Sequence, residues 1–297
     1  MKVFYTVDEM REWSRAQKRA KRTIAFVPTM GALHEGHLSL MREAKKHGDL
    51  LAVSIYVNPA QFGPNEDLNK YPRTLEQDIA KSKDVGAHAV FIPTDDQIYP
   101  DGFQTYVNVQ EMTKSLCGAS RPTHFMGVTT VVAKLFNIIR PDVSIFGEKD
   151  FQQLAVIRRM VSDLNMPIKI IGCPIVREAD GLAMSSRNKY LSPEERAAAL
   201  SLSRSLKHVE KMVAEGENSA RVISAAVGEI IASEKLVRID YISLVDAGTL
   251  EDIDEVDRPT VLAIAAFVGS TRLIDNICLS GKFQIPNSND QTNPKFQ

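Results

Sequence analysis

Up to about residue 176, short apolar runs that predict strands alternate with amphipathic stretches that predict helices. The expected strands are residues 23–28, 50–58, 89–93, 143–147 and 168–176. The expected helices between them are residues 37–48, 74–86, 127–140 and 150–164. The strand runs are apolar at nearly every position, which indicates burial on both faces, as in a parallel sheet covered by helices. The pattern therefore predicts an α/β N-terminal domain with a Rossmann-like, doubly wound parallel sheet.

The pattern changes after Val176. A long helix is predicted over residues 191–216, because Ser192 can cap it, Pro193 suits the first helical position and Glu195 completes a capping box. A second helix is predicted near residues 218–234. Three strands then follow, at residues 237–247, 260–268 and 271–279.

Helices followed by strands predict a small α+β domain with an antiparallel sheet. We expect one domain over residues 1–176 and the smaller one over residues 177–285, where it is placed to act as a lid. The polar, turn-rich residues 286–297 are expected to be disordered.

Composition places the chain among globular enzymes. It has 297 residues, 44% of them hydrophobic and 25% charged, with a formal net charge of −1. The balanced charge argues against a nucleic-acid partner. The three cysteines are far apart, which favours neither a disulfide framework nor a zinc knuckle. The longest uncharged apolar run has ten residues and the N-terminus lacks an apolar signal core, so we expect a cytoplasmic protein without a membrane partner.

The stretch VPTMGALHEGHLSL, residues 27–40, places two histidines between the first strand of this pattern and the helix after it. Such a loop lies at the carboxyl end of the strand, where open α/β sheets bind ligands. Gly31 permits close backbone approach, and the helix N-terminus favours an anion. His34 and His37 can add donors to phosphate oxygens, so phosphate chemistry is favoured. A metal site, weakened by the absence of HExxH, and a loop without function are the alternatives.

Three further segments carry polar side chains at comparable positions. Residues 184–187, MSSR, can form a triphosphate clamp from hydroxyls, amides and a guanidinium, although alone they are more typical of a linker turn. Lys149 follows a predicted strand and is either a phosphate contact or a surface residue. Gln61 follows another strand, where its amide can donate to a carboxylate or hydroxyl and accept from an amine, or can belong to a plain turn.

Taken together, the strings PTMGALHEGH, YVNPAQF, FGEKDFQQL and VREADGLAMSSRN resemble the pantothenate synthetase (pantoate–β-alanine ligase) family. HEGH and MSSR look like the HIGH and KMSKS signatures of the nucleotidylyltransferase superfamily. The resemblance runs from about Val3 to about Gly281. It implies a ligase that adenylates (R)-pantoate with ATP, releases pyrophosphate, and lets the β-alanine amine displace AMP to give pantothenate, the precursor of coenzyme A. It also implies Mg²⁺ and a cytoplasmic homodimer.

The resemblance assigns roles residue by residue. It implies catalytic roles for His37, called the proton donor, and for His34 and Lys149. It implies pantoate binding by Gln61 and Gln153, with β-alanine overlapping at Gln61. Arg121 and His124 align with a substrate-cover segment, and Asp78 lies near a suggested Mg²⁺ position. The implied ATP-binding residues are Met30, Gly31, Ala32, Leu33, His34, Glu35, Gly36, His37, Gly147, Glu148, Lys149, Asp150, Val176, Met184, Ser185, Ser186 and Arg187.

Three rival functions differ in what they require. Another nucleotidylyltransferase would act on a different acceptor, such as a phosphorylated cofactor precursor or transfer RNA. A non-catalytic nucleotide-binding protein would have lost motif residues, whereas both histidines, Lys149 and the MSSR segment are present. A zinc hydrolase would hold metal. The group that accepts the proton of the β-alanine amine, a histidine or a backbone carbonyl, is left open by the sequence.

Overall fold

The computed structural model describes residues 1–64 and 66–279. It divides into two compact units, the first with residues 1–179 and 183–189, the second with residues 180–182 and the chain from Tyr190 onward. This division differs from the expected boundary after Val176, because the chain enters the second unit for three residues and then returns with the MSSR segment to the first. The expected disordered tail lies outside the described residues.

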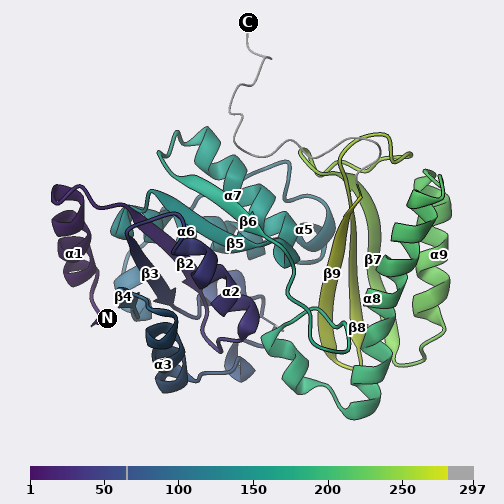
Figure 1. Ribbon diagram of the computed structural model, residues 1–297, viewed down its shortest axis with the longest axis horizontal. Coiled ribbons are helices and arrows are strands. Elements are labelled where there is room, and N and C mark those ends of the chain that lie inside the picture. Colours follow the sequence, from purple (N-terminus) through teal and green to yellow (C-terminus); the bar gives the residue numbers. More distant parts are fainter. Residues whose placement is uncertain (65, 280–297) are drawn as a thin grey trace, which may run out of the picture. The chain divides into compact units, whose positions relative to one another are not determined.

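The first unit is built on a six-stranded sheet in the order β1-β4-β3-β2-β5-β6 (Figure 1). Every pairing in it is parallel, as the apolar runs predicted. Strand β1 was not predicted from the sequence, because its three residues are too few to show a hydrophobic pattern. The strands are β1 (Lys2–Phe4), β2 (Ile24–Thr29), β3 (Leu50–Ile55), β4 (Ala89–Phe91), β5 (Val143–Gly147) and β6 (Lys169–Cys173).

Helices cover both faces of this sheet, which confirms the doubly wound α/β prediction. Along β2, Phe26 points into the core with α1, α6 and α7, and its ring meets Phe136 edge-on at 6.3 Å. Val27 points to the opposite face, into the core that contains Met41 of α2. The helices are α1 (Val7–Arg19), α2 (Glu35–Ala44), α3 (Leu75–Val85), α4 (Asp95–Ile98), α5 (Leu116–Ser120), α6 (His124–Ile139) and α7 (Phe151–Asp163).

The second unit packs two helices, α8 (Pro193–Ala214) and α9 (Ala220–Ala232), on one face of a three-stranded antiparallel sheet (Figure 1). The predicted capping box between Ser192 and Glu195 is present at the start of α8. The α+β prediction is confirmed. The strands are β7 (Val237–Asp246), β8 (Thr260–Val268) and β9 (Thr271–Leu279). Among the helices of the described chain, none combines the length and apolar character needed to cross a bilayer.

Candidate active site

A pocket opens at the carboxyl ends of the central strands of the first unit, and all of its lining residues belong to that unit. Strand β2 lies between β3 and β5 here. Ligands bind at such a position in open α/β sheets. Short helical turns follow the neighbouring strands, η1 (Pro59–Gln61) after β3 and η3 (Glu148–Asp150) after β5. The predicted residues in its wall are Met30, His34, Gly36, His37, Gln61, Arg121, His124, Gly147, Lys149, Asp150, Gln153, Val176, Met184, Ser185, Ser186 and Arg187.

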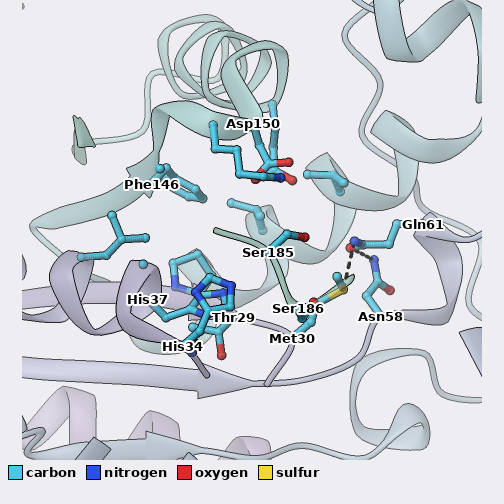
Figure 2. A pocket seen from close by; sticks show the side chains of 18 of the residues that line it. Thr29, Met30, His34, His37, Asn58, Gln61, Phe146, Asp150, Ser185 and Ser186 are labelled. Carbon is cyan, nitrogen blue, oxygen red and sulfur yellow. Dashed lines mark hydrogen bonds between the residues drawn. The ribbon is translucent and has the colours of Figure 1, made fainter. Parts of the chain in front are cut away.

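The two histidines lie side by side at the N-terminus of α2 (Figure 2). Their ring centroids are 4.1 Å apart, with the planes tilted by 36°. The backbone N–H of His34 donates to Nδ1 of His37 at 3.3 Å. Because Nδ1 accepts, the neutral His37 ring carries its proton on Nε2 and can donate it to a ligand. The Nδ1 atom of His34 is buried and has no hydrogen-bond partner among the residues that the structure describes.

Both imidazoles are held neutral by their surroundings. Burial, followed by the nearby Lys149 ammonium, lowers the pKa of His34 to about 4. Burial, followed by His34 and then Lys149, lowers the pKa of His37 to about 3. Desolvation disfavours the charged ring, and a cation nearby disfavours it further. Neutral rings can donate hydrogen bonds to an anion but carry no permanent charge.

The MSSR segment reaches the histidine loop from far along the chain. The Sδ atom of Met184 accepts from the backbone N–H of Gly36 at 3.2 Å. The hydroxyl of Ser186 donates to the hydroxyl of Tyr71 at 3.4 Å. Two loops separated by about 150 residues in sequence thus meet in one wall, as the phosphate-clamp prediction requires.

Arg187 is already paired with a carboxylate. Its Nε and Nη2 atoms donate to the two oxygens of Asp67 at 2.9 Å and 2.8 Å. Burial acts to raise the pKa of Asp67, but the Arg187 hydrogen bonds and charge lower it below its usual range. Any anion that binds the forked guanidinium face must therefore displace Asp67.

The side-chain amide of Asn58 is fixed by backbone groups. Its Oδ1 accepts from the N–H of Ala60 at 3.3 Å, and its Nδ2 donates to the carbonyl of Gly127 at 3.1 Å. The hydroxyl of Tyr99 adds a second donor to Oδ1 at 2.8 Å. If the Asn58 amide were flipped, its NH₂ group would meet the N–H of Ala60 and its oxygen would meet the carbonyl of Gly127. The backbone groups therefore fix the orientation of the Asn58 amide.

The fixed Asn58 in turn orients Gln61. Asn58 Nδ2 donates to Gln61 Oε1 at 3.1 Å, so the Gln61 Nε2 group is left as the donor, and it rests on the weak acceptor Met30 Sδ at 3.1 Å (Figure 2). Gly127 allows this approach, because a Cβ there would lie 2.2 Å from the Ala60 carbonyl oxygen. The sequence left Gln61 able to donate or accept; the structure assigns it as a donor, which suits an acid.

Behind Gln61, two pocket residues of the predicted cover segment contact its backbone carbonyl. Nδ1 of His124 lies 2.9 Å from that oxygen, and Nη2 of Arg121 donates to it at 3.2 Å. Arg121 also forms two hydrogen bonds with the Glu66 carboxylate, at 2.6 Å and 2.5 Å. Burial, followed by the Arg121 charge, lowers the pKa of His124 to about 4. The neutral ring donates from Nδ1, which leaves Nε2 as an acceptor.

Several predicted residues do not reach the pocket wall. The N–H groups of Ala32 and Leu33 point to the Asp78 carboxylate, at 2.9 Å and 2.8 Å, and so are not available to a nucleotide. The Glu35 side chain pairs with Arg42 on the outside of α2. Gly31 and Glu148 also lie outside the set that lines the pocket.

The geometry around Asp78 does not favour the metal role that the resemblance suggested for it. Its side chain is fully buried, both oxygens accept backbone N–H groups, and it does not line the pocket. Among the described residues that line the pocket, Asp150 is the only acidic one. Within residues 1–64 and 66–279, no group of three or more histidine, cysteine, aspartate or glutamate side chains could hold a metal ion.

The charge and shape of the pocket favour anionic ligands with apolar parts. Lys149, Arg121 and Arg187 line the pocket together with the Asp150 carboxylate. Arg121 and Arg187 are paired with Glu66 and Asp67, so their charge reaches an anion fully only when those carboxylates are displaced. One side of the wall is apolar and comes mainly from α6 and β5; its residues include Val128, Val131, Val132, Leu135, Ile145 and Phe146.

The sequence did not identify Asn58, Asp67, Glu66, Tyr71 or Tyr99 as parts of this site. Asn58 stands within the quoted YVNPAQF string but was expected only to end a strand. The others follow no periodicity, and their roles depend on hydrogen bonds to residues 41–120 positions away. Only the tertiary fold reveals them.

The amino-acid sequence is similar to those of one family of known proteins. The sequence pattern of pantoate-beta-alanine ligases matches residues 2–278. A pantothenate synthetase of Syntrophus aciditrophicus (strain SB) is 55% identical over 276 residues, which cover 93% of this chain and 96% of that protein.

Solved structures of the same family have a fold similar to that of this chain. The pantothenate synthetase of Thermus thermophilus has a TM-score of 0.88 at 41% identity, covering 93% of this chain and 99% of that one. The pantoate-beta-alanine ligase of Francisella tularensis, solved in complex with beta-gamma ATP and beta-alanine, has a TM-score of 0.76 at 32% identity, covering 94% and 97%. With the pattern matched over nearly its whole length, the chain belongs to the pantoate–β-alanine ligase family.

Proposed function

We propose that this protein condenses (R)-pantoate with β-alanine at the expense of ATP, through a pantoyl-adenylate, and releases pyrophosphate and AMP. One observation carries the proposal. The neutral histidine pair, Lys149 and the MSSR segment converge on one pocket whose far side holds Gln61 as a fixed donor. Family membership and the likeness to a relative solved with ATP and β-alanine support it.

In the first step two anions must come within bonding reach. At ~4 Å and an effective dielectric of about 20, their repulsion is about 4 kcal/mol. Lys149 and Arg187 offset this charge, and Nε2–H of His37 donates to a phosphate oxygen as charge develops on it. Each preorganised donor of this kind contributes roughly 3–4 kcal/mol to lowering the barrier. Gln61 and Gln153 orient pantoate, so that one carboxylate oxygen attacks the α-phosphorus and pyrophosphate leaves.

In the second step the β-alanine nitrogen attacks the acyl carbon of the adenylate, and the bond from that carbon to the phosphate oxygen breaks. The amine must lose protons on the way. His124 offers an unprotonated Nε2, because its Nδ1 donates to the Gln61 carbonyl. We assign this nitrogen as the hydrogen-bond acceptor that positions the incoming ammonium. A ring with a pKa of about 4 is too weak a base to take the ammonium proton, so the proton leaves the amine to another acceptor.

Magnesium fits this pocket only as an ion carried by ATP. Mg²⁺ is commonly bound by one or two carboxylates together with substrate phosphates, rather than by a protein cage. Asp150, the acidic side chain of the lining, is the residue that would contact it. When bound, the ion would neutralise phosphate charge during adenylation. The expected homodimer, cytoplasmic location and lid movement of the smaller domain stay predictions of the family resemblance.

The function is tested by following pyrophosphate release and pantothenate formation with the purified protein. We expect pyrophosphate release that depends on pantoate and ATP but not on β-alanine, and AMP-linked pantothenate once β-alanine is added. A panel of other small acids separates this activity from those of related nucleotidylyltransferases. ATP binding without turnover on any acid would instead support a non-catalytic nucleotide-binding protein.

An Asp67→Asn substitution should lower the KM for ATP several-fold. The change removes the carboxylate that occupies the Arg187 fork, so the triphosphate no longer has to displace it. It also leaves a half-buried guanidinium without its anion, which should cost about 1–2 kcal/mol of stability before ATP binds, discounted for partial exposure.

The measurement pairs steady-state kinetics with thermal melting, with and without ATP. Asp163→Asn is the matched control, because it removes the partner of Arg159 in an exposed pair on α7. A higher KM for ATP in Asp67→Asn than in the control would contradict competition for Arg187.

A further inference from the structure

The Asp78 carboxylate lies buried against the backbone of the histidine loop and is not among the residues that line the pocket. It projects from α3 and is 0% exposed. One oxygen accepts from the N–H of Leu33 at 2.8 Å, and the other accepts from the N–H of Ala32 at 2.9 Å and from the Thr74 hydroxyl at 3.2 Å. A carboxylate so far from solvent is expected to have a specific role.

The backbone that Asp78 binds is held in an unusual conformation. Gly31 has φ +83° and Ala32 has φ +49°, so two successive residues occupy the left-handed region. Glycine adopts this region readily, whereas the Cβ of alanine disfavours it. The turn directs the N–H groups of Ala32 and Leu33 to the same side, where each donates to one oxygen of the Asp78 carboxylate. The carboxylate therefore stabilises a loop shape that the alanine would otherwise oppose.

Helix α3 holds the same loop by a second contact, in which α3 supplies the hydrogen-bond donor and the loop supplies the acceptor. Nζ of Lys81 donates to the carbonyl of Leu33 at 2.6 Å. The next residue is His34, whose N–H fixes the tautomer of His37. A displacement of Leu33 would thus pass directly to both catalytic imidazoles.

We propose that Asp78 is a positioning residue, which holds the left-handed turn at Gly31 and Ala32 so that His34 and His37 face the nucleotide. Lys81 assists it. The role of Asp78 deepens the function proposed above. Its kinetic readouts rest on that function, whereas the ATP-binding readouts do not.

The first experiment compares Asp78→Asn with the wild-type protein. The amide keeps the shape but offers one oxygen, so one loop N–H faces an NH₂ group. We expect kcat for pantoate-dependent pyrophosphate release to fall about 10²-fold, the size of effect produced by misplaced catalytic groups. The KM for pantoate and the Mg²⁺ concentration at half-maximal rate should stay unchanged, and ATP should bind more weakly by calorimetry. Recovery of activity at high Mg²⁺ would identify a metal ligand instead and overturn the proposal.

The second experiment tests the cause by rescue. Adding Ala32→Gly to Asp78→Asn lets the loop adopt positive φ without the clamp, so kcat should recover several-fold. A general loss of folding would not be repaired by this glycine. A double variant that is no more active than Asp78→Asn would overturn the proposed role.

Two controls separate positioning from stability. Asp142→Asn removes a carboxylate that also accepts a backbone N–H, from Ile24 at 2.7 Å, but at the amino end of β2; it should lower the melting temperature and leave kcat near wild type. If Asp78→Asn does not fold, Lys81→Met tests the same loop, with the exposed Lys83→Met beside it on α3 as its match. Lys81→Met should lower kcat and weaken ATP binding. If Lys81→Met and Lys83→Met had the same kcat and the same ATP affinity, the proposal would be overturned.

If the wild-type protein shows no pantoate-dependent turnover, the proposed function fails and not the positioning role. The latter is then decided by ATP affinity alone. Weaker ATP binding in Asp78→Asn, restored by Ala32→Gly, supports it, and equal ATP binding in all three proteins overturns it.

Discussion

A His37→Ala variant should release pyrophosphate about 10²–10³-fold more slowly than the wild-type protein, with normal folding. The neutral ring donates from Nε2, because its Nδ1 accepts from the His34 N–H. That donor matters most when negative charge builds on the phosphate, so kcat should fall more than the affinity for ATP. Pyrophosphate release in a single turnover, with circular dichroism and thermal melting alongside, measures the effect.

The pH dependence of the adenylation rate in the wild-type protein and in His37→Ala gives a second test. Burial, with neighbouring positive charge second, lowers the pKa of His34 to about 4 and that of His37 to about 3, so both rings stay neutral from pH 6 to pH 8. The wild-type adenylation rate should therefore show no histidine ionisation in that range. An acidic limb near pH 6.5 that disappears in His37→Ala would show that the ring works as a cation. Near-wild-type turnover by His37→Ala would refute its catalytic role.

The second large effect is expected at Gln61, where Gln61→Glu should lower kcat/KM for pantoate by about 10³-fold or more. Asn58 still donates to one side-chain oxygen, so the other oxygen replaces the donor that faced the pocket. The loss of a preorganised donor accounts for about 10²-fold. Repulsion between two carboxylates adds to it, with an upper size of about 4 kcal/mol at ~4 Å and a dielectric of about 20.

Gln61→Met is the matched variant, because it keeps the length of the side chain but has neither the donor nor the charge. It should lose less than Gln61→Glu, and ATP affinity should be similar in both. Separate titrations of ATP and pantoate measure this. If Gln61→Glu bound pantoate as well as Gln61→Met did, the amide would not present its N–H to the acid, and the orientation imposed by Asn58 would be without consequence.

Much of the fold follows from local patterns. The central strands were predictable because Ile24–Thr29 and Leu50–Ile55 are apolar on both faces, a pattern that only a covered parallel sheet satisfies. The capping box at Ser192 was readable because its partners are three residues apart. Strand β1 was not, because its three residues are held by pairing with β4, some 87 positions away in sequence.

The features of the site can likewise be separated into those that the sequence predicts and those that depend on the fold. The sequence by itself determined which chemical groups are available, since His34, His37, Lys149 and Arg187 stand in recognisable strings beside predicted strand ends. Only the tertiary structure decided what each group faces. It turned the Ala32 and Leu33 amides toward Asp78, placed Asp67 on Arg187, and made Gln61 a donor through Asn58. The physical reason is that donor and acceptor polarity in a buried site is set by partners that the folded chain brings together, and for Asp78 and Asp67 those partners are 45–120 residues away in sequence.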